Sequence, residues 1–504
     1  MRNSSNYKAN RNDSHVYGKV LFFAGMMILS GVFFGCSNPY TPPSTASVST
    51  IELTVADMPG FYVPADFTGI SFETDATELN HRNVNGYLFT ESNQQLITLF
   101  QNTAVRSLRF GGCTVDFYHD KAYDYAAIDN IFAFAKAVGI KIIYSLPLLN
   151  ADPEPGAATA KYIWTHYKDC LDCFSIGNEP NCPPYQEAPE GALHSYGEYY
   201  PVWQKAFEAV LREVPDARFT GPDSGGWQYA EEFTRDTKES GRILFITHHQ
   251  YPNGKPTLED GKTRISAEIA IERMLSPGML TGEYTKLWAL TDGIVQPYGF
   301  RCRMTESNDY LGGITGASNA MSSALWALDY MNWQAFRGLC GINFHNNQWL
   351  TTCTFTMKES GEYAVNPKAH AIRAFDMITG GWTVPVNIMS NPDQVNLTAY
   401  AVKGDDYLYV TIINKEHLYG QEPPRQAAVT ISTKGLTKDK AEAMYLLAPG
   451  NDAGAVTGIT LGGDSITNHH TWEGKWESVK KKGNGQYRVN VVESSAVIVK
   501  IPIK

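Results

Sequence analysis

The sequence lacks an excess of positive charge, a second long apolar run and a glycine-rich phosphate loop. Its 42 Lys and Arg residues are outnumbered by 52 Asp and Glu residues, for a net charge of −10. This balance argues against nucleic acid as a partner. Beyond residue 35, no apolar stretch is long enough to span a membrane. No glycine-rich loop follows the first expected strand, which disfavours a doubly wound sheet.

The cysteine pattern contains no complete metal site. Cys170 and Cys173 have the two-residue spacing of half a zinc or redox site, but no second half with matching His or Cys follows, so we predict no metal ligands. Setting Cys36 aside leaves seven of the eight cysteines, and an odd number means at least one free thiol. A disulfide among Cys170, Cys173 and Cys182 and a set of buried, inert thiols both fit the sequence.

The first 36 residues have the pattern of a secretory leader. Basic residues precede an uncharged apolar stretch from 20 to 34, which is too short to cross a bilayer comfortably. The stretch ends at Gly35-Cys36, which resembles the lipid attachment site of bacterial lipoproteins. We therefore expect residues 1–36 to be a signal peptide ending at a lipidated Cys36, residues 37–49 to be a tether, and the protein to be exported and lipid-anchored to the bacterial outer membrane. Ordinary signal-peptide cleavage near the same position is the alternative.

The rest of the chain divides into two regions with different hydrophobic patterns. Between residues 65 and 382, eight apolar, β-branched-rich runs alternate with amphipathic stretches of helical period. This alternation predicts an α/β fold, a (β/α)8 TIM barrel. The runs are 67–72, 104–110, 140–145, 173–177, 218–221, 243–247, 299–305 and 341–344. Residues 383–504 form short alternating runs separated by turn residues, which predicts an antiparallel β-sandwich, and residues 50–64 are expected to add strand structure to it.

Polar side chains occupy the expected carboxyl ends of the barrel strands, where barrel enzymes carry out their chemistry. Glu179 follows the run 173–177, and Glu306 follows the run 299–305. Two glutamates delivered by separate strands are the arrangement that glycoside hydrolysis needs, and retention of configuration requires their carboxyl groups to lie about 5 Å apart. The other strand ends carry Glu73, Asp116, Asn150, Asn178, Asp223, His249 with Tyr251, and His345 with Asn346.

Five motifs, taken in their order along the chain, resemble glycoside hydrolase family 79. They are Leu108 to Asp116, Ile176 to Asn181, His248 to Pro252, Thr305 to Asn308 and Ala324 to Tyr330. The family holds β-glucuronidases and heparanase-like endo-glucuronidases, belongs to the clan of retaining barrel glycosidases and has a C-terminal β-sandwich. The resemblance implies an exported retaining β-glucuronidase that acts on glucuronides or uronate-containing glycans and needs no cofactor or metal.

The resemblance also implies roles for individual residues. Glu179 would be the general acid/base, in surroundings that keep it protonated, and Glu306 the nucleophile, ionised beside hydrogen-bond donors. Asn178 would hydrogen-bond the sugar hydroxyl next to the anomeric carbon. Tyr251 would orient the nucleophile.

Further residues are expected to bind the substrate. Asp116 and His249 are assigned to this group from their strand ends. The loop after the seventh strand resembles the one that holds the uronate carboxylate in the family, through Tyr310, Gly312 and Gly313. The stretch that starts at Asn346 departs from the second such loop of the family, and we expect Asn346 itself to contact the substrate.

Several assignments stay open in the sequence. Glu73 and Arg109 lie near the same end of neighbouring strands, so we expect them to form a structural ion pair. Neighbouring residues of a strand face opposite sides, so only one of His248 and His249 can face the site.

Two further functions are compatible with the sequence. A surface lipoprotein could bind glycans in the barrel cleft without cleaving them, and a glycosidase of the same clan could act on another sugar. Either Arg301 or Arg303 could supply positive charge to a uronate if its side chain points into the site.

Overall fold

The computed structural model describes residues 47–503 apart from 82–83, 118–122, 150–151, 183–192, 347–350, 359, 421, 434–436, 438–439 and 484. Cys36, the leader and most of the tether lie outside the described residues, as do Asn150 and the stretch after Asn346. Residues 44–504 form one compact unit. Among the described residues, no helix is both long and apolar enough to cross a membrane.

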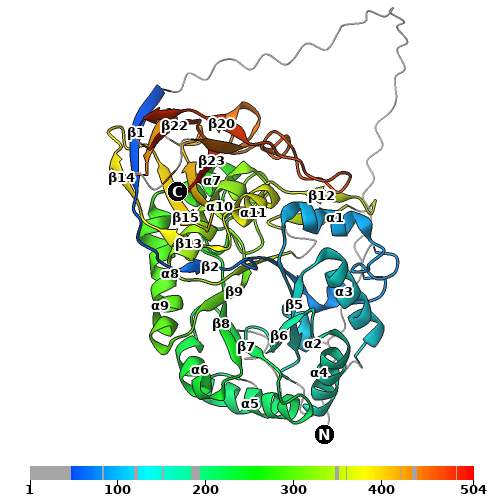
Figure 1. Cartoon of the computed structure of the whole chain (residues 1–504). Helices are drawn as coiled ribbons and strands as arrows, with labels where there is room; N and C mark the ends of the chain where they lie inside the picture. The colour runs from blue at the N-terminus through cyan, green and yellow to red at the C-terminus, as the bar shows by residue number, and fades with distance from the viewer. Residues whose placement is uncertain are drawn as a thin grey trace, which may run out of the picture. The chain divides into compact units, whose positions relative to one another are not determined.

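The predicted barrel is confirmed. Eight parallel strands close in the order β10-β3-β4-β5-β6-β7-β8-β9, and Figure 1 shows helices such as α4, α5 and α6 outside this ring. The strands are β3 Thr68–Glu73, β4 Ser107–Gly111, β5 Lys141–Leu146, β6 Leu171–Ile176, β7 Phe219–Gly225, β8 Ile243–Gln250, β9 Cys302–Ser307 and β10 Ile342–His345. The principal helices are α1 Gln94–Thr103, α3 Tyr125–Val138, α4 Glu154–Tyr167, α5 Tyr196–Glu213, α6 Ala230–Thr237, α7 Ala267–Leu275, α8 Tyr284–Leu290, α9 Asp292–Val295, α10 Met321–Phe336 and α11 Lys368–Asp376.

Two strand boundaries differ from the predicted ones. Strand β7 extends to Gly225, well past the predicted end at 221, because Ser224 and Gly225 pair with His248 and His249 of β8. Strand β9 starts at Cys302 rather than at 299, because a 3-10 turn, Gln296–Tyr298, ends at Gly299 with φ 84°. The extension of β7 brings the polar residues Asp223 and Ser224 to the carboxyl end of that strand.

The C-terminal part forms the predicted antiparallel domain, built from two sheets. One sheet has the order β14-β1-β17-β22-β21, and the other runs β19-β18-β23-β16-β15-β13-β2 with β20 paired to β18. The strands are β1 Ser47–Val55, β2 Tyr62–Val63, β13 Gly381–Val384, β14 Val386–Ser390, β15 Leu397–Lys403, β16 Tyr407–Asn414, β17 Arg425–Ser432, β18 Ala441–Leu447, β19 Thr460–Leu461, β20 Glu477–Val479, β21 Lys481–Gly483, β22 Gln486–Val491 and β23 Ser495–Pro502. Strand β1 lies parallel to β17 and antiparallel to β14, so the beginning of the described chain contributes to this domain.

A buried ion pair joins the two parts of the compact unit. Asp329 of helix α10 accepts hydrogen bonds from Thr398, Tyr400 and Lys415 of the β-domain, and its Oδ2 lies 3.0 Å from Lys415 Nζ. Both charged side chains are only 2 % exposed. Because a buried charge needs a partner, this contact ties helix α10 to strands β15 and β16.

All seven cysteines of the described part of the chain are free thiols. A disulfide among Cys170, Cys173 and Cys182 is therefore not formed, and the alternative of unpaired thiols describes the structure. Burial raises the pKa of the Cys182 thiol to about 12, so that thiol is inert near neutral pH.

Candidate active site

Two glutamates face each other at the carboxyl ends of the fourth and seventh barrel strands. Glu179 comes three residues after β6, with a left-handed φ of 50°, and its backbone N–H donates to the Asp223 carbonyl over 2.8 Å. Glu306 lies within β9 and its side chain is 10 % exposed, against 23 % for that of Glu179. An oxygen of each carboxylate and a ring nitrogen of His249 all lie within 4.8 Å of one another. The two carboxyl groups are thus as close as the retaining mechanism requires.

The carboxylate of Glu306 is held ionised by its neighbours. Tyr251 donates a hydrogen bond to Oε1 over 2.7 Å, and Arg109 Nη1 donates to Oε2 over 3.3 Å. His345 Nδ1 lies 3.7 Å from the same Oε2. Burial acts to raise the pKa of Glu306, but His345, His249 and Arg109 together lower it to about 2. A carboxylate in this state is available as a nucleophile throughout the ordinary pH range.

Arg109 lies directly beneath the site. It is fully buried on β4, and besides Glu306 it contacts Asp223 Oδ2 at 3.3 Å and the side-chain oxygen of Asn178 at 2.7 Å. Burial acts to raise the pKa of Asp223, but Arg109 above all holds it well below its usual range. Thr305 Oγ1 donates a further hydrogen bond to Asp223. One guanidinium therefore neutralises carboxylates from two strands and fixes Asn178 beside them.

His249 connects the two glutamates. Its Nδ1 lies 2.9 Å from Glu179 Oε1 and 3.9 Å from Glu306 Oε2, and its Nε2 lies 3.7 Å from Asp223 Oδ1. Burial acts to lower the pKa of His249, but Glu306, Asp223 and Glu179 raise it to about 9. The ring therefore carries a proton at neutral pH and donates to Glu179. His248 points to the other side of the strand, toward Asp292, so the prediction that only one of the two histidines faces the site is confirmed.

A second acidic position flanks Glu306. Glu73, at the end of β3, accepts hydrogen bonds from the backbone N–H and the hydroxyl of Thr114 over 3.0 and 2.9 Å. Its Oε1 lies 3.6 Å from His345 Nε2, so His345 lies between two carboxylates. Gly112 allows this packing, because a Cβ at that residue would lie 2.3 Å from the Glu73 carboxyl group.

Some predicted substrate-binding residues are engaged elsewhere. Asp116 is buried, and its Oδ1 accepts the backbone N–H groups of Leu148 and Leu149. Asn346 is buried and forms two hydrogen bonds with the backbone of Phe355. The Tyr310 hydroxyl donates to the Ala270 carbonyl over 3.2 Å. These three side chains shape the loops around the site.

The loop of Tyr310 turns through two glycines in the left-handed region. Gly312 has φ 82° and Gly313 has φ 70°. A Cβ on Gly313 would lie 2.8 Å from the backbone nitrogen of Thr352, so only glycine fits this close approach. The Arg264 guanidinium donates to the Gly313 carbonyl over 2.6 Å, so the protein's own groups hold this loop.

One prediction about arginine is wrong, and the inward direction on which a role for Arg301 or Arg303 depended is not observed. Within the described residues, Arg109 pairs with Asp223 and Glu306 rather than with Glu73. Its position two residues before the end of β4 places the guanidinium under the centre of the ring, where it reaches the fifth and seventh strands. Arg301 donates to the backbone carbonyls of Tyr62, Gly338 and Leu339 at the opposite end of the barrel.

Arg303 likewise lies away from the two glutamates. It donates to Asn343 and to the Asp66 carbonyl, close to the start of strands β10 and β3. Neither Arg301 nor Arg303 can therefore supply positive charge to a substrate at the glutamates.

The sequence alone did not identify every residue that builds the site. Asp223 and His345 were noted at strand ends, but their partners became visible only in the closed ring. Arg109 shares its side of β4 with Gly111, and this period-two alternation was the available signal that it points inward. Trp227, 48 % exposed, lies just beyond β7 in a loop that Asn181 fixes through two hydrogen bonds to the backbone of Gly225.

The barrel fold and its two facing carboxylates are typical of a glycoside hydrolase, and comparisons with known proteins support this class. Residues 399–498 match the family model described as the glycosyl hydrolase family 79 C-terminal beta domain. The match confirms the predicted family resemblance over this part of the chain. Together with the fold of the barrel, it supports a glycoside hydrolase. A search of curated proteins found no match.

Solved structures of glycosidases share the fold over most of the chain. A 4-O-α-L-rhamnosyl-β-D-glucuronidase from Fusarium oxysporum 12S is 15 % identical, with a TM-score of 0.68, and the alignment covers 89 % of this chain and 99 % of that one. A family 51 arabinofuranosidase from Xanthomonas axonopodis pv. citri is 17 % identical, with a TM-score of 0.65 and coverage of 90 % and 100 %. At these identities the comparison establishes the shared fold.

Proposed function

We propose that this protein is a retaining β-glycosidase that cleaves β-glucuronides or uronate-containing glycans, with Glu306 as nucleophile and Glu179 as general acid/base. The observation that carries the proposal is the approach of the two carboxylates to within 4.8 Å, which leaves no room for a water molecule between Glu306 and the sugar. The match to the family 79 β-domain favours a uronide over other sugars.

The first chemical step forms a glycosyl-enzyme ester. A Glu306 carboxylate oxygen attacks the anomeric carbon, the bond to the leaving oxygen breaks, and Glu179 gives its proton to that oxygen. Tyr251 and Arg109 hold the attacking carboxylate in one orientation. In the second step Glu179 takes a proton from water, the resulting hydroxide attacks the anomeric carbon, and the Glu306 carboxylate is released.

We assign Asn178 to the hydroxyl next to the anomeric carbon. Its side-chain oxygen is fixed by Arg109 at 2.7 Å, which sets the direction of the amide group. Hydrogen bonds to this hydroxyl strengthen in the transition state of glycosidases. Asn178 therefore completes the polar surface around the reacting carbon.

An aryl glycoside panel tests the reaction and the sugar together. We expect release of nitrophenol from the β-glucuronide and not from the matching β-glucoside, β-xyloside or β-galactoside. Nitrophenol release should fall to background in Glu306→Ala, and cleavage of a separate glycoside with a poor leaving group should fall by about 10²- to 10⁴-fold in Glu179→Ala. Azide should restore turnover to Glu179→Ala, because it replaces water in the second step.

Glu239→Ala is the matched control, since that side chain is 90 % exposed, and it should keep full activity. Wild-type activity in either active-site variant would refute the assigned roles. Activity on another glycoside would preserve the mechanism and refute the uronide. Binding of an oligosaccharide without release of a reducing end would support the glycan-binding alternative instead.

Export with a lipid anchor at Cys36 is proposed from the leader alone. Cells supplied with labelled fatty acid should label the wild-type protein and not Cys36→Ala. An unlabelled wild-type protein recovered from the exported fraction would instead favour ordinary signal-peptide cleavage.

A further inference from the structure

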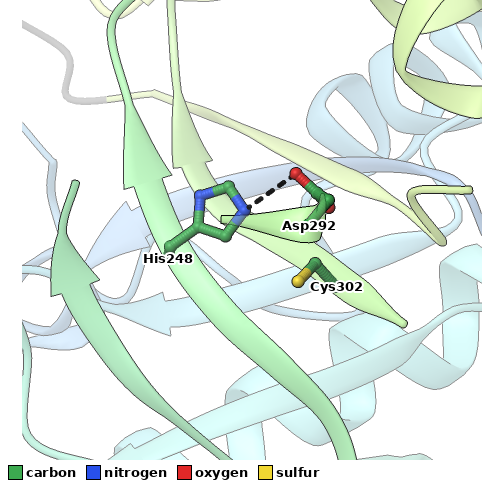
Figure 2. A group of neighbouring side chains, drawn as sticks. All are labelled: His248, Asp292 and Cys302. Atoms are coloured by element: carbon green, nitrogen blue, oxygen red, sulfur yellow. Dashed lines mark ion pairs between the residues drawn. The ribbon is translucent and has the colours of Figure 1, made fainter. Parts of the chain in front are cut away.

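A group of metal-ligating side chains lies on the outer face of the barrel, on the opposite side of β8 from the candidate active site. His248 of β8, Asp292 at the start of α9 and Cys302 at the start of β9 each offer one ligand atom, and these atoms lie within 4.8 Å of one another. All three residues are at most 1 % exposed. Figure 2 shows the imidazole of His248 directed at Asp292, with Cys302 beside it.

The contacts inside this group do not satisfy its polar atoms. His248 Nε2 lies 3.6 Å from Asp292 Oδ2, which is beyond hydrogen-bond distance. Both ring nitrogens of His248 and the Oδ1 of Asp292 have no hydrogen-bond partner although they are buried. Unpaired buried polar atoms are costly, and a ring with two of them requires an explanation.

The spacing that is wrong for a hydrogen bond is right for coordination. In a tetrahedral zinc site with nitrogen and oxygen ligands at about 2.0–2.1 Å, neighbouring ligand atoms lie roughly 3.4 Å apart, and a sulfur ligand widens this to roughly 3.5 Å. The separation of His248 Nε2 and Asp292 Oδ2 is 3.6 Å, close to the first of these values, and the sulfur of Cys302 lies within 4.8 Å of the ligand atoms of both residues.

We propose that His248, Asp292 and Cys302 supply three protein ligands to Zn²⁺ or a similar divalent transition-metal ion. Imidazole, carboxylate and thiolate are the ligands that such ions take. The Thr291 hydroxyl donates to Asp292 Oδ2 over 3.0 Å and orients the carboxylate from behind. On binding, the Cys302 thiol loses its proton to solvent and the metal–sulfur bond replaces the S–H bond. The ion would join β8, α9 and β9, the last of which carries Glu306.

Metal titration of the purified full-length protein tests this site. After dialysis against a chelator, we expect about one equivalent of Zn²⁺ to bind and to raise the melting temperature. Co²⁺ should give a sulfur-to-metal charge-transfer band, which reports coordination by thiolate independently of activity. Cys302→Ala should lose both the band and the shift in melting temperature.

Cys173→Ala is the matched control, because Cys173 is equally buried in a barrel strand and lies outside the group. Asp292→Asn, which keeps the side-chain volume, provides a second variant and should bind the metal more weakly. Absence of bound metal and of a charge-transfer band in the wild type would overturn the proposal. So would an unchanged charge-transfer band in Cys302→Ala, which would move the metal to another cysteine.

Discussion

Replacement of Arg109 by Met tests whether one buried cation holds the site together. The side chain is fully buried and lies 3.3 Å from both Asp223 and Glu306. Removing one partner of a buried ion pair costs about 3–5 kcal/mol of unfolding free energy, because it leaves an unpaired buried charge. Here two carboxylates lose the same partner, so we expect a loss at the upper end of this range.

Arg106→Met is the matched control at the start of the same barrel strand. Arg106 also binds a carboxylate with two hydrogen bonds, to Asp376 at 2.7 and 2.8 Å, but its side chain is 45 % exposed. Such a pair contributes about 0–1 kcal/mol. Urea unfolding of both variants at neutral pH measures the difference.

The pH dependence distinguishes loss of charge pairing from loss of packing. Arg109 is one of the groups that lower the pKa of Glu306, so the Glu306 pKa should rise in Arg109→Met, and the acidic limb of any remaining activity should move to higher pH. Adding Asp223→Asn should recover part of the lost stability, because one of the two carboxylates that lost Arg109 as a partner is then absent. Equal losses in Arg109→Met and Arg106→Met, with an unmoved acidic limb, would refute the reasoning.

Four further predictions concern single side chains. Tyr251→Phe removes the 2.7 Å hydrogen bond to Glu306 and should lower kcat about 10- to 100-fold on aryl glycosides, with an unchanged far-ultraviolet spectrum. The folded-state pKa of Glu306 is lowered from 4.5 to about 2. Its contribution of about 3 kcal/mol to the unfolding free energy is therefore complete above pH 4.5 and is lost as the pH falls through 2. In Glu306→Gln, the unfolding free energy should change less steeply with pH over this range. Lys415→Met leaves Asp329 buried without its cation and should cost about 3–5 kcal/mol, measured by calorimetry as earlier unfolding. Trp227→Ala should raise KM for oligosaccharides about three- to tenfold and leave kcat for small aryl glycosides unchanged, because the exposed ring in the loop after β7 offers a surface on which a sugar can stack.

The barrel was predictable because the same sequence pattern, an apolar run followed by an amphipathic stretch, repeats along the chain. Each strand is a short apolar run between amphipathic helices, so an error in one run does not alter the fold. The boundaries of β7 and β9 were not predictable from such runs, since Ser224 and Gly225 become strand residues only through pairing with β8. Strand ends were therefore located to within a few residues, which was sufficient to find Glu179 and Glu306.

The pairing of charges was not predictable from neighbouring positions along the strands. Glu73 and Arg109 lie on adjacent strands, and adjacency suggested a pair. In the closed ring, however, an inward side chain reaches across the barrel, so Arg109 meets Asp223 and Glu306 from the fifth and seventh strands. Tyr310 and Asn346 hydrogen-bond to the backbone of the protein itself, which the sequence did not indicate, because a loop residue that can bind a ligand can equally bind a backbone group.

Among the charged side chains at the carboxyl ends of the barrel strands, Glu179 is a carboxyl group outside the balance of three anions and three cations. The pKa values of Asp223, Glu306 and Glu73 are all lowered by their neighbours, so these three groups are anions. Three cations oppose them, because Arg109 stays charged and the pKa values of His249 and His345 are raised. The three cations balance the three anions, and Glu179 is the carboxyl group that remains. Glu179 has its own partner in His249, whose Nδ1 lies 2.9 Å from Glu179 Oε1. The carboxylate that remains after Glu179 protonates the leaving oxygen is therefore hydrogen-bonded by His249 until it takes a proton from water in the second step.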